Sequence, residues 1–156
     1  MTIRDNILFG QPLDKERYVD AVRLCELESD LCIFPAGDQT EIGEKGINLS
    51  GGQKARVSLA RAVYQNKDIY LMDDPISALD AAVRKKVMKN VVMGCLQDKT
   101  RILVTHAIDF VHLADKIIIM DKGQIAGQGT YEELRNNEIL IKLIEMNNLG
   151  KASPSQ

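Results

Sequence analysis

Tryptophan is absent from this chain, and aromatic residues make up only 4% of it. Few side chains are therefore available on which bases could stack, which is not typical of proteins that bind single-stranded nucleic acids. The formal net charge of −2 also gives no broadly positive surface that would attract phosphate backbones. We expect no nucleic-acid partner.

Cysteines are few, and long hydrophobic runs are missing. Cys25, Cys32 and Cys95 form no C-x-x-C pair, and neither histidine lies near them in the sequence. We therefore expect free thiols in a reducing compartment rather than a metal site or a disulfide framework. No apolar run is long enough to span a bilayer, and the first five residues do not resemble a signal peptide.

Hydrophobic residues account for 45% of the 156 residues, which is ordinary for a globular domain with a core of its own. The apolar periodicity predicts alternating elements. Helices are expected over 14–29, 50–65, 78–95 and from 130 through 144, and strands over 69–72, 101–105, 116–120 and 124–126. Short continuous apolar runs favour buried parallel strands, and Asp121-Lys122-Gly123 favours a hairpin between the last two. The predicted fold class is α/β, with a mostly parallel sheet and a C-terminal β-hairpin followed by a helix.

The most informative stretch is Leu49-Ser50-Gly51-Gly52-Gln53, called the LSGGQ segment below. Its two adjacent glycines stand at the start of a predicted helix, where they leave the first backbone N–H groups open to close approach. A helix start of this kind attracts anions, because the N–H groups lack helical partners and the dipole is positive there. A phosphate-binding turn is one interpretation, and an ordinary glycine-containing loop before a helix is the other.

Site residues are also expected where two predicted strands end. Asp73 and Asp74 follow the apolar run Ile69–Met72, and His106 follows the strand over 101–105. Ligands of parallel sheets bind at the carboxyl ends of the strands, so these positions suit functional side chains. The alternatives are an aspartate that only ends a strand and a histidine that is simply a polar residue. Ser77 stands before a predicted helix, and a purely structural interpretation is that it caps that helix.

Taken in order, these motifs resemble those of the ATP-binding cassette (ABC) ATPases. The LSGGQ segment is identical to the signature motif of that family, and Ile69–Asp73 resembles its Walker B strand. Ser77-Ala78-Leu79-Asp80 resembles the D-loop, His106 the switch histidine, and Thr40–Gly46 the X-loop of exporters. The resemblance extends from Thr2 to about Asn147. It is strongest to the first nucleotide-binding domain of the C subfamily, the multidrug-resistance-associated-protein type.

The resemblance implies a role for each site residue. Leu49, Ser50, Gly51, Gly52 and Gln53 would contact the γ-phosphate of an ATP held by a second ABC ATPase domain. Asp80, in the D-loop, would lie at the interface that links the two ATP sites.

The remaining residues would serve the other ATP site. Asp73 would hold Mg²⁺, and His106 would contact the γ-phosphate. Asp74 stands where the family usually has a glutamate that activates water. Because aspartate is one methylene shorter, hydrolysis supported by Asp74 is in question.

No Gly-x-x-x-x-Gly-Lys-Ser/Thr phosphate loop occurs in the sequence. The resemblance therefore implies a P-loop NTPase-like ABC ATPase domain that lacks its N-terminal Walker A part. Residues 1–146 would form this partial domain, with a helical and signature region over 14–65 and the Walker B to C-terminal helix region over 66–146. Residues 147–156 are polar and are expected to be a tail or linker.

The expected function is that of a nucleotide-binding-domain portion of an ATP-driven membrane exporter. Its cofactors would be ATP and Mg²⁺, and its partners a second ATPase domain and the transmembrane domains of the same transporter. It would lie at the cytoplasmic face of a membrane. The alternative is a catalytically silent chain that only binds other ABC domains. A soluble ABC ATPase of the DNA-repair or translation type is disfavoured, because no coiled-coil heptads or tandem cassettes are present.

The missing phosphate loop gives a direct prediction. The purified chain should neither bind Mg-ATP in the micromolar range nor hydrolyse it, because the loop amides and lysine supply most of the grip on the phosphates. Isothermal titration calorimetry and a phosphate-release assay would test this. Micromolar affinity for ATP would contradict it.

Overall fold

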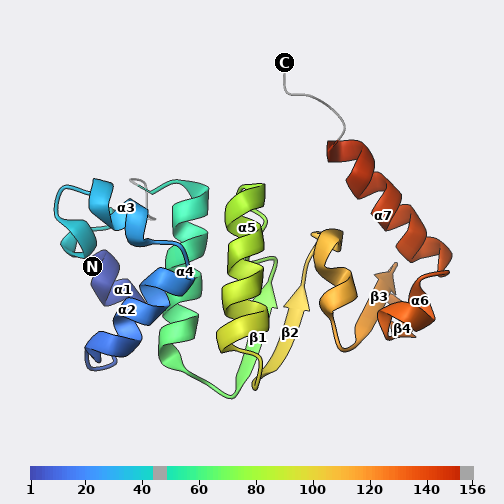
Figure 1. The fold of residues 1–156 in the computed structure, drawn as a ribbon, viewed down its shortest axis with the longest axis horizontal. Helices are drawn as coiled ribbons and strands as arrows, with labels where there is room; N and C mark the ends of the chain where they lie inside the picture. Colours follow the sequence, from blue (N-terminus) through green and yellow to red (C-terminus); the bar gives the residue numbers. More distant parts are fainter. Residues whose placement is uncertain (44–48, 152–156) are drawn as a thin grey trace. The chain divides into compact units, whose positions relative to one another are not determined.

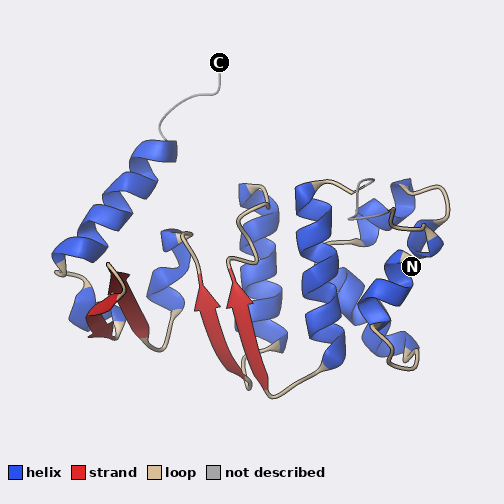
Figure 2. Cartoon of the chain, turned by 180° about the vertical axis from the view of Figure 1, so that it is seen from behind, coloured by secondary structure: helices blue, strands red, loops and turns tan. Residues whose placement is uncertain are grey.

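The computed structural model describes residues 1–43 and 49–151 (Figure 1). The chain forms two compact units, Met1–Thr105 and His106–Gln156. Together they contain the α/β elements that the sequence predicts, with a parallel strand pair in the first unit and a hairpin followed by helices in the second (Figure 2).

Helices dominate the N-terminal part of the first unit. They are α1 (Ile3–Leu8), α2 (Lys15–Leu24), α3 (Glu28–Ile33), the 3-10 helix η1 (Gly37–Gln39) and α4 (Gly51–Gln65). Both α1 and α2 pack against α4. Asp14 caps α2 as its position suggests, but the helix predicted over 14–29 is broken. Glu26 has a φ of 57°, so the chain turns between α2 and α3 instead of continuing as one helix.

Two parallel strands follow α4. Strand β1 (Ile69–Asp73) pairs with β2 (Thr100–Val104), with Ile69 opposite Thr100 and Asp73 opposite Val104. The connection contains α5 (Ala81–Val87) and a π-helix, η3 (Met88–Cys95). The helix predicted over 78–95 therefore begins at Ala81, because the preceding residue, Asp80, forms its N-cap.

Burial of β1 alternates rather than covering both faces. Tyr70 and Met72 are buried, whereas Leu71 is 75% exposed, and Ile102 and Val104 of β2 are exposed as well. The expectation of strands buried on both faces is therefore wrong for β1 within this unit. One face of the pair packs into the unit, and the other carries exposed branched side chains.

The second unit contains the predicted hairpin. Its elements are η4 (Ile108–Leu113), β3 (Ile117–Asp121), β4 (Gln124–Gly129), α6 (Tyr131–Leu134) and α7 (Glu138–Lys151). Strands β3 and β4 pair antiparallel, and a small core gathers Ile117, Ile119, Leu134 and Leu140.

The C-terminal helix departs from the prediction in two ways. The capping box of Thr130 and Glu133 is confirmed. The single helix expected from residue 130 is in fact two, because Asn137 caps a new start by accepting hydrogen bonds from Ile139 N and Leu140 N. Helix α7 then continues to Lys151, into the segment expected to be a tail, and 152–156 lie outside the described residues.

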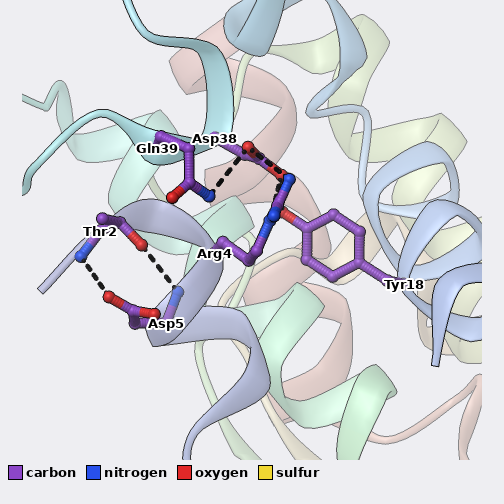
Figure 3. A network of polar contacts seen from close by, with 6 residues as sticks. All are labelled: Thr2, Arg4, Asp5, Tyr18, Asp38 and Gln39. Carbon is purple, nitrogen blue, oxygen red and sulfur yellow. Dashed lines mark hydrogen bonds and ion pairs between the residues drawn. The ribbon is translucent and has the colours of Figure 1, made fainter. Parts of the chain in front are cut away.

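A polar network fastens the start of the first unit to the segment after α3 (Figure 3). The Arg4 guanidinium donates to both oxygens of Asp38, at 2.8 and 3.0 Å, and the Tyr18 hydroxyl donates to Asp38 Oδ2 at 2.9 Å. Beside this network, Thr2 and Glu41 form an isolated antiparallel bridge. In the predicted loop over 40–46, Thr40 O accepts from Ile3 N and Ile42 N donates to Met1 O, each at 3.0 Å, and residues 44–46 lie outside the described residues.

The network predicts an acid-sensitive stability. Burial raises the pKa of Asp38, but the hydrogen bonds from Arg4, Tyr18 and Gln39 outweigh it, so this pKa is below its ordinary value. The stability that the carboxylate contributes is therefore present above about pH 4 and lost as the pH falls through the native pKa. We expect Asp38→Asn to lower the unfolding free energy at pH 7.

The difference between Asp38→Asn and the unchanged chain should shrink below about pH 4. Denaturant unfolding at several pH values measures it. The exposed Asp98, changed to Asn, is the matched control and should leave the profile unchanged. A difference that is constant with pH would contradict the assignment.

Candidate functional site

The LSGGQ segment lies at the start of α4, as predicted. Ser50 is the N-cap, with an extended backbone, and its Oγ accepts a hydrogen bond from Gln53 N at 3.2 Å. In return, Ser50 N donates to Gln53 Oε1 at 2.9 Å, which completes a capping box. The O–H of Ser50 is not used in this cap, so the hydroxyl keeps its one donor for another group.

The first turn of α4 presents backbone N–H groups that the helix itself does not use. The first backbone bond of the helix runs from Lys54 N to Ser50 O, so the amides of Gly51 and Gly52 have no partner one turn earlier. Gly51 is exposed, and because both residues are glycines they have no side chains of their own to cover these amides. With the positive end of a 15-residue helix behind them, the two amides can receive an anion at close range.

The two glycines differ in how much space surrounds them. A Cβ on Gly52 would lie 3.2 Å from the carbonyl oxygen of Ala78, tighter than most real contacts, whereas one on Gly51 would lie 3.7 Å from Ala78 Cβ, an ordinary contact. Gly52 therefore permits the close approach of the segment Ser77–Asp80. The fold thus brings two of the sequence-predicted motifs, the LSGGQ segment and Ser77–Asp80, into contact.

Asp80 uses its carboxylate to cap α5. Its Oδ1 accepts hydrogen bonds from Ala82 N and Val83 N, each at 3.0 Å. The hydrogen bond from Val83 N is the largest effect on the pKa of Asp80 and lowers it; desolvation opposes this, and the bond from Ala82 N adds to the lowering. The suggestion that Ser77 caps this helix is wrong, since the Ser77 hydroxyl donates instead to the backbone oxygen of Asp74 at 2.9 Å.

Asp73 and Asp74 lie at the end of β1, where the sequence places them. Asp73 is exposed and is the last residue of the strand. Asp74 has a φ of 44°, and its backbone N–H donates to Val104 O at 2.8 Å. Its Oδ1 accepts a hydrogen bond from Thr105 Oγ1 at 3.3 Å. Sequence reasoning did not single out Thr105, although its place at the end of the neighbouring strand could have suggested it.

His106 is the first residue of the second unit, whereas Asp73 and Asp74 belong to the first. Its side chain is exposed, and its backbone oxygen accepts a hydrogen bond from Ile108 N. Among the residues that the structure describes, no three His, Cys, Asp or Glu side chains cluster as a metal site. Asp73 would therefore supply a single carboxylate to a magnesium ion, which usually keeps several of its waters.

Sequence reasoning missed two long-range contacts of the LSGGQ segment and the first turns of α4. Asp30 of α3 accepts hydrogen bonds from Gln53 and Arg56. In the sequence Asp30 is an unremarkable acid within a helical pattern, and only its pairing with α4 in the fold gives it significance.

An α/β fold with acids at the ends of parallel strands and a glycine-rich helix start agrees with the P-loop NTPase-like class that the motifs imply. The sequence profile described as "ABC transporter" matches residues 1–77. The chain belongs to the ABC transporter family, and its relatives are of the multidrug-resistance-protein type.

Three relatives illustrate the similarity. The chain is 59% identical to multidrug resistance protein mrp-7 of Caenorhabditis elegans over 86% of its length. It is 50% identical to the oligomycin resistance ATP-dependent permease of Saccharomyces cerevisiae over 92%, and 52% identical to ATP-binding cassette sub-family C member 3 of Rattus norvegicus over 88%. The matched regions cover 9%, 10% and 9% of these proteins, so the chain corresponds to about a tenth of each. Within the described residues, no helix has the length and apolar character needed to cross a membrane.

The unequal surroundings of the two glycines predict opposite effects of alanine. Gly51→Ala should raise the unfolding free energy by up to about 1 kcal/mol, because alanine favours helix and meets only ordinary contacts. Gly52→Ala should lower it by about 1 kcal/mol or more, because the Cβ is forced against a backbone oxygen. Urea unfolding of both variants measures the difference. Equal effects would show that the approach of Ala78 does not require a glycine at 52.

Proposed function

We propose that this chain is part of the ATPase domain of a membrane exporter, and that its LSGGQ segment completes an ATP site shared with a second ATPase domain. The observation that carries the proposal is the first turn of α4. The Ser50 hydroxyl keeps its donor there, beside the amides of Gly51, which is exposed, and of Gly52, which is half-buried. These groups fit the terminal phosphate of ATP, which supplies the negative charge that a helix N-terminus favours.

The division of work between two domains follows from the few donors of the LSGGQ segment. The phosphate chain of ATP needs several donors and a cation, which this segment does not supply by itself. The LSGGQ segment offers a few directed donors and no mobile lysine. It is therefore suited to closing over a phosphate that another domain already holds.

The remaining sequence-predicted residues are proposed for the other ATP site. Asp73 would hold Mg²⁺, His106 would contact the terminal phosphate, and Asp80 would lie near the interface between the domains. Asp74 would be a poor general base there. Its carboxylate is short and accepts a hydrogen bond from Thr105, which directs it toward β2.

The proposed setting is the cytoplasmic face of a membrane, where the transmembrane domains of the same transporter would be coupled to this domain. Support comes from the relatives, one of which is named an ATP-dependent permease. What is exported would be decided by membrane helices, so the chain itself does not define the substrate.

A chimera with the yeast permease tests the proposal. This chain would replace the matching 145-residue region of the oligomycin resistance permease in a strain that lacks its own copy. Gly51→Asp is expected to abolish the oligomycin resistance that the chimera confers, because a carboxylate would occupy the place of the phosphate. The same change should stabilise α4 by about 0.3–1 kcal/mol, since an acid favours the first turn of a helix. Loss of function would then not reflect unfolding.

Ser58→Asp is the matched control, since Ser58 is exposed on the same helix but lies away from its start. It should leave resistance intact at equal expression. Resistance retained by Gly51→Asp would remove the LSGGQ segment from the mechanism.

A further inference from the structure

We propose that Asp30 is a positioning residue for the phosphate-binding turn at Ser50–Gln53, acting through Gln53 and Arg56. The inference rests on the function proposed for the LSGGQ segment and adds to it a residue that lies outside every motif in the sequence.

Asp30 is the buried charged residue of the described core, with 7% of its surface exposed. Its Oδ2 accepts a hydrogen bond from Arg56 Nη2 at 2.6 Å, and its Oδ1 accepts one from Gln53 Nε2 at 3.0 Å. The side chains of Asp30 and Arg56 are only 10% and 12% exposed. Burying an ion pair costs desolvation, and an apolar pair of similar volume would often be as stable, so stability alone does not account for it.

The contact with Gln53 fixes the orientation of its carboxamide. A carboxylate can only accept hydrogen bonds, so it holds the NH₂ end of Gln53 and turns the oxygen end toward Ser50. That oxygen accepts the bond from Ser50 N at 2.9 Å. The carboxamide is therefore held at both ends, and with it the capping box that shapes the turn. A site whose supporting contacts are fixed in this way keeps its donors aimed before the ligand arrives.

Arg56 extends this support to the glycines. A Cβ on Gly52 would lie 3.5 Å from Arg56 Nη1, so the guanidinium lies beside the turn. Its Nε is buried without a hydrogen-bond partner in the described part of the chain. Asp30 thus balances the charge of Arg56 and holds the guanidinium against the first turn of α4.

Asparagine at this position would break the arrangement at one point. The amide has one accepting and one donating end, so it can accept from Arg56 or from Gln53 but not from both. If it accepts from Arg56, its NH₂ faces the NH₂ of Gln53. The carboxamide of Gln53 must then turn, and the bond to Ser50 N is lost.

A second substitution can restore the chain of hydrogen bonds. In Asp30→Asn with Gln53→Glu, Arg56 donates to the asparagine oxygen and the asparagine NH₂ donates to the glutamate. The other glutamate oxygen accepts from Ser50 N. The total charge of the cluster is unchanged. Gln53→Glu alone places two carboxylates 3.0 Å apart, at the present distance of Gln53 Nε2 from Asp30 Oδ1, and should be as harmful as Asp30→Asn.

The first measurement uses the 156-residue chain without nucleotide. Amide hydrogen exchange at Ser50 and Gln53 should become about tenfold faster in each single variant and return toward the original rate in the double variant. Asp38→Asn is the matched control. It also breaks an ion pair with an arginine, but one that does not contact the LSGGQ segment, so exchange at Ser50 and Gln53 should not change.

The second measurement uses ATP hydrolysis by the purified yeast chimera. Because the turn meets a phosphate that another domain holds, Asp30→Asn should lower kcat about tenfold and change KM less than about twofold. The double variant should recover part of the loss in kcat, and Asp38→Asn should retain the original value. If Asp30 had only a structural role, moving its negative charge to residue 53 would not restore kcat.

The outcomes separate the two proposals. Unchanged exchange at Ser50 and Gln53 in Asp30→Asn, or single and double variants that lose kcat equally, would overturn the role of Asp30. That result would leave the function of the LSGGQ segment standing if Gly51→Asp still abolishes resistance. Resistance retained by Gly51→Asp would overturn the proposed function whatever the exchange data show.

Discussion

The first unit depends on how side chains of α4 satisfy the carbonyl groups at the end of α1. Arg61 donates from Nε to Asn6 O at 2.7 Å, and Gln65 donates from Nε2 to Leu8 O at 2.9 Å. Carbonyls at the end of so short a helix have no partner within it. Leu8 O also accepts from Gln11 N at 2.9 Å, and leaving Asn6 O unpaired would be costly. Tyr64 continues the pattern, with its hydroxyl donating to Pro12 O and accepting from Asp14 N. The far half of α4 thereby holds the N-terminal segment in place.

The near half of the same helix carries the proposed site. One rigid element therefore joins the network of Arg4 and Asp38, through α1, to the amides of Gly51 and Gly52. The approach of Ala78 to Gly52 adds Ser77–Asp80 to this body.

Elements with local signals could be predicted from the sequence, and those that depend on distant contacts could not. The start of α4, the cap at Asp14, the hairpin and the box at Thr130 each follow from a few neighbouring residues. The break at Glu26 was missed because nothing in its side chain favours a positive φ. The same holds for the site. The LSGGQ segment was found from its glycines, whereas Asp30 acts across the fold and carries no local signal in the sequence.

The backbone conformation of Asp74 helps to explain why this chain has aspartate where the family usually has a glutamate. At a φ of 44° its backbone is in the left-handed region, where aspartate and asparagine are several-fold enriched over other side chains. Two groups at the end of β2 hold it there, Val104 through its backbone oxygen and Thr105 through its hydroxyl. Aspartate is thus favoured by the local backbone. A phosphate-binding turn such as Ser50–Gln53 needs no general base of its own, so the role proposed for that turn does not depend on which acid stands at position 74.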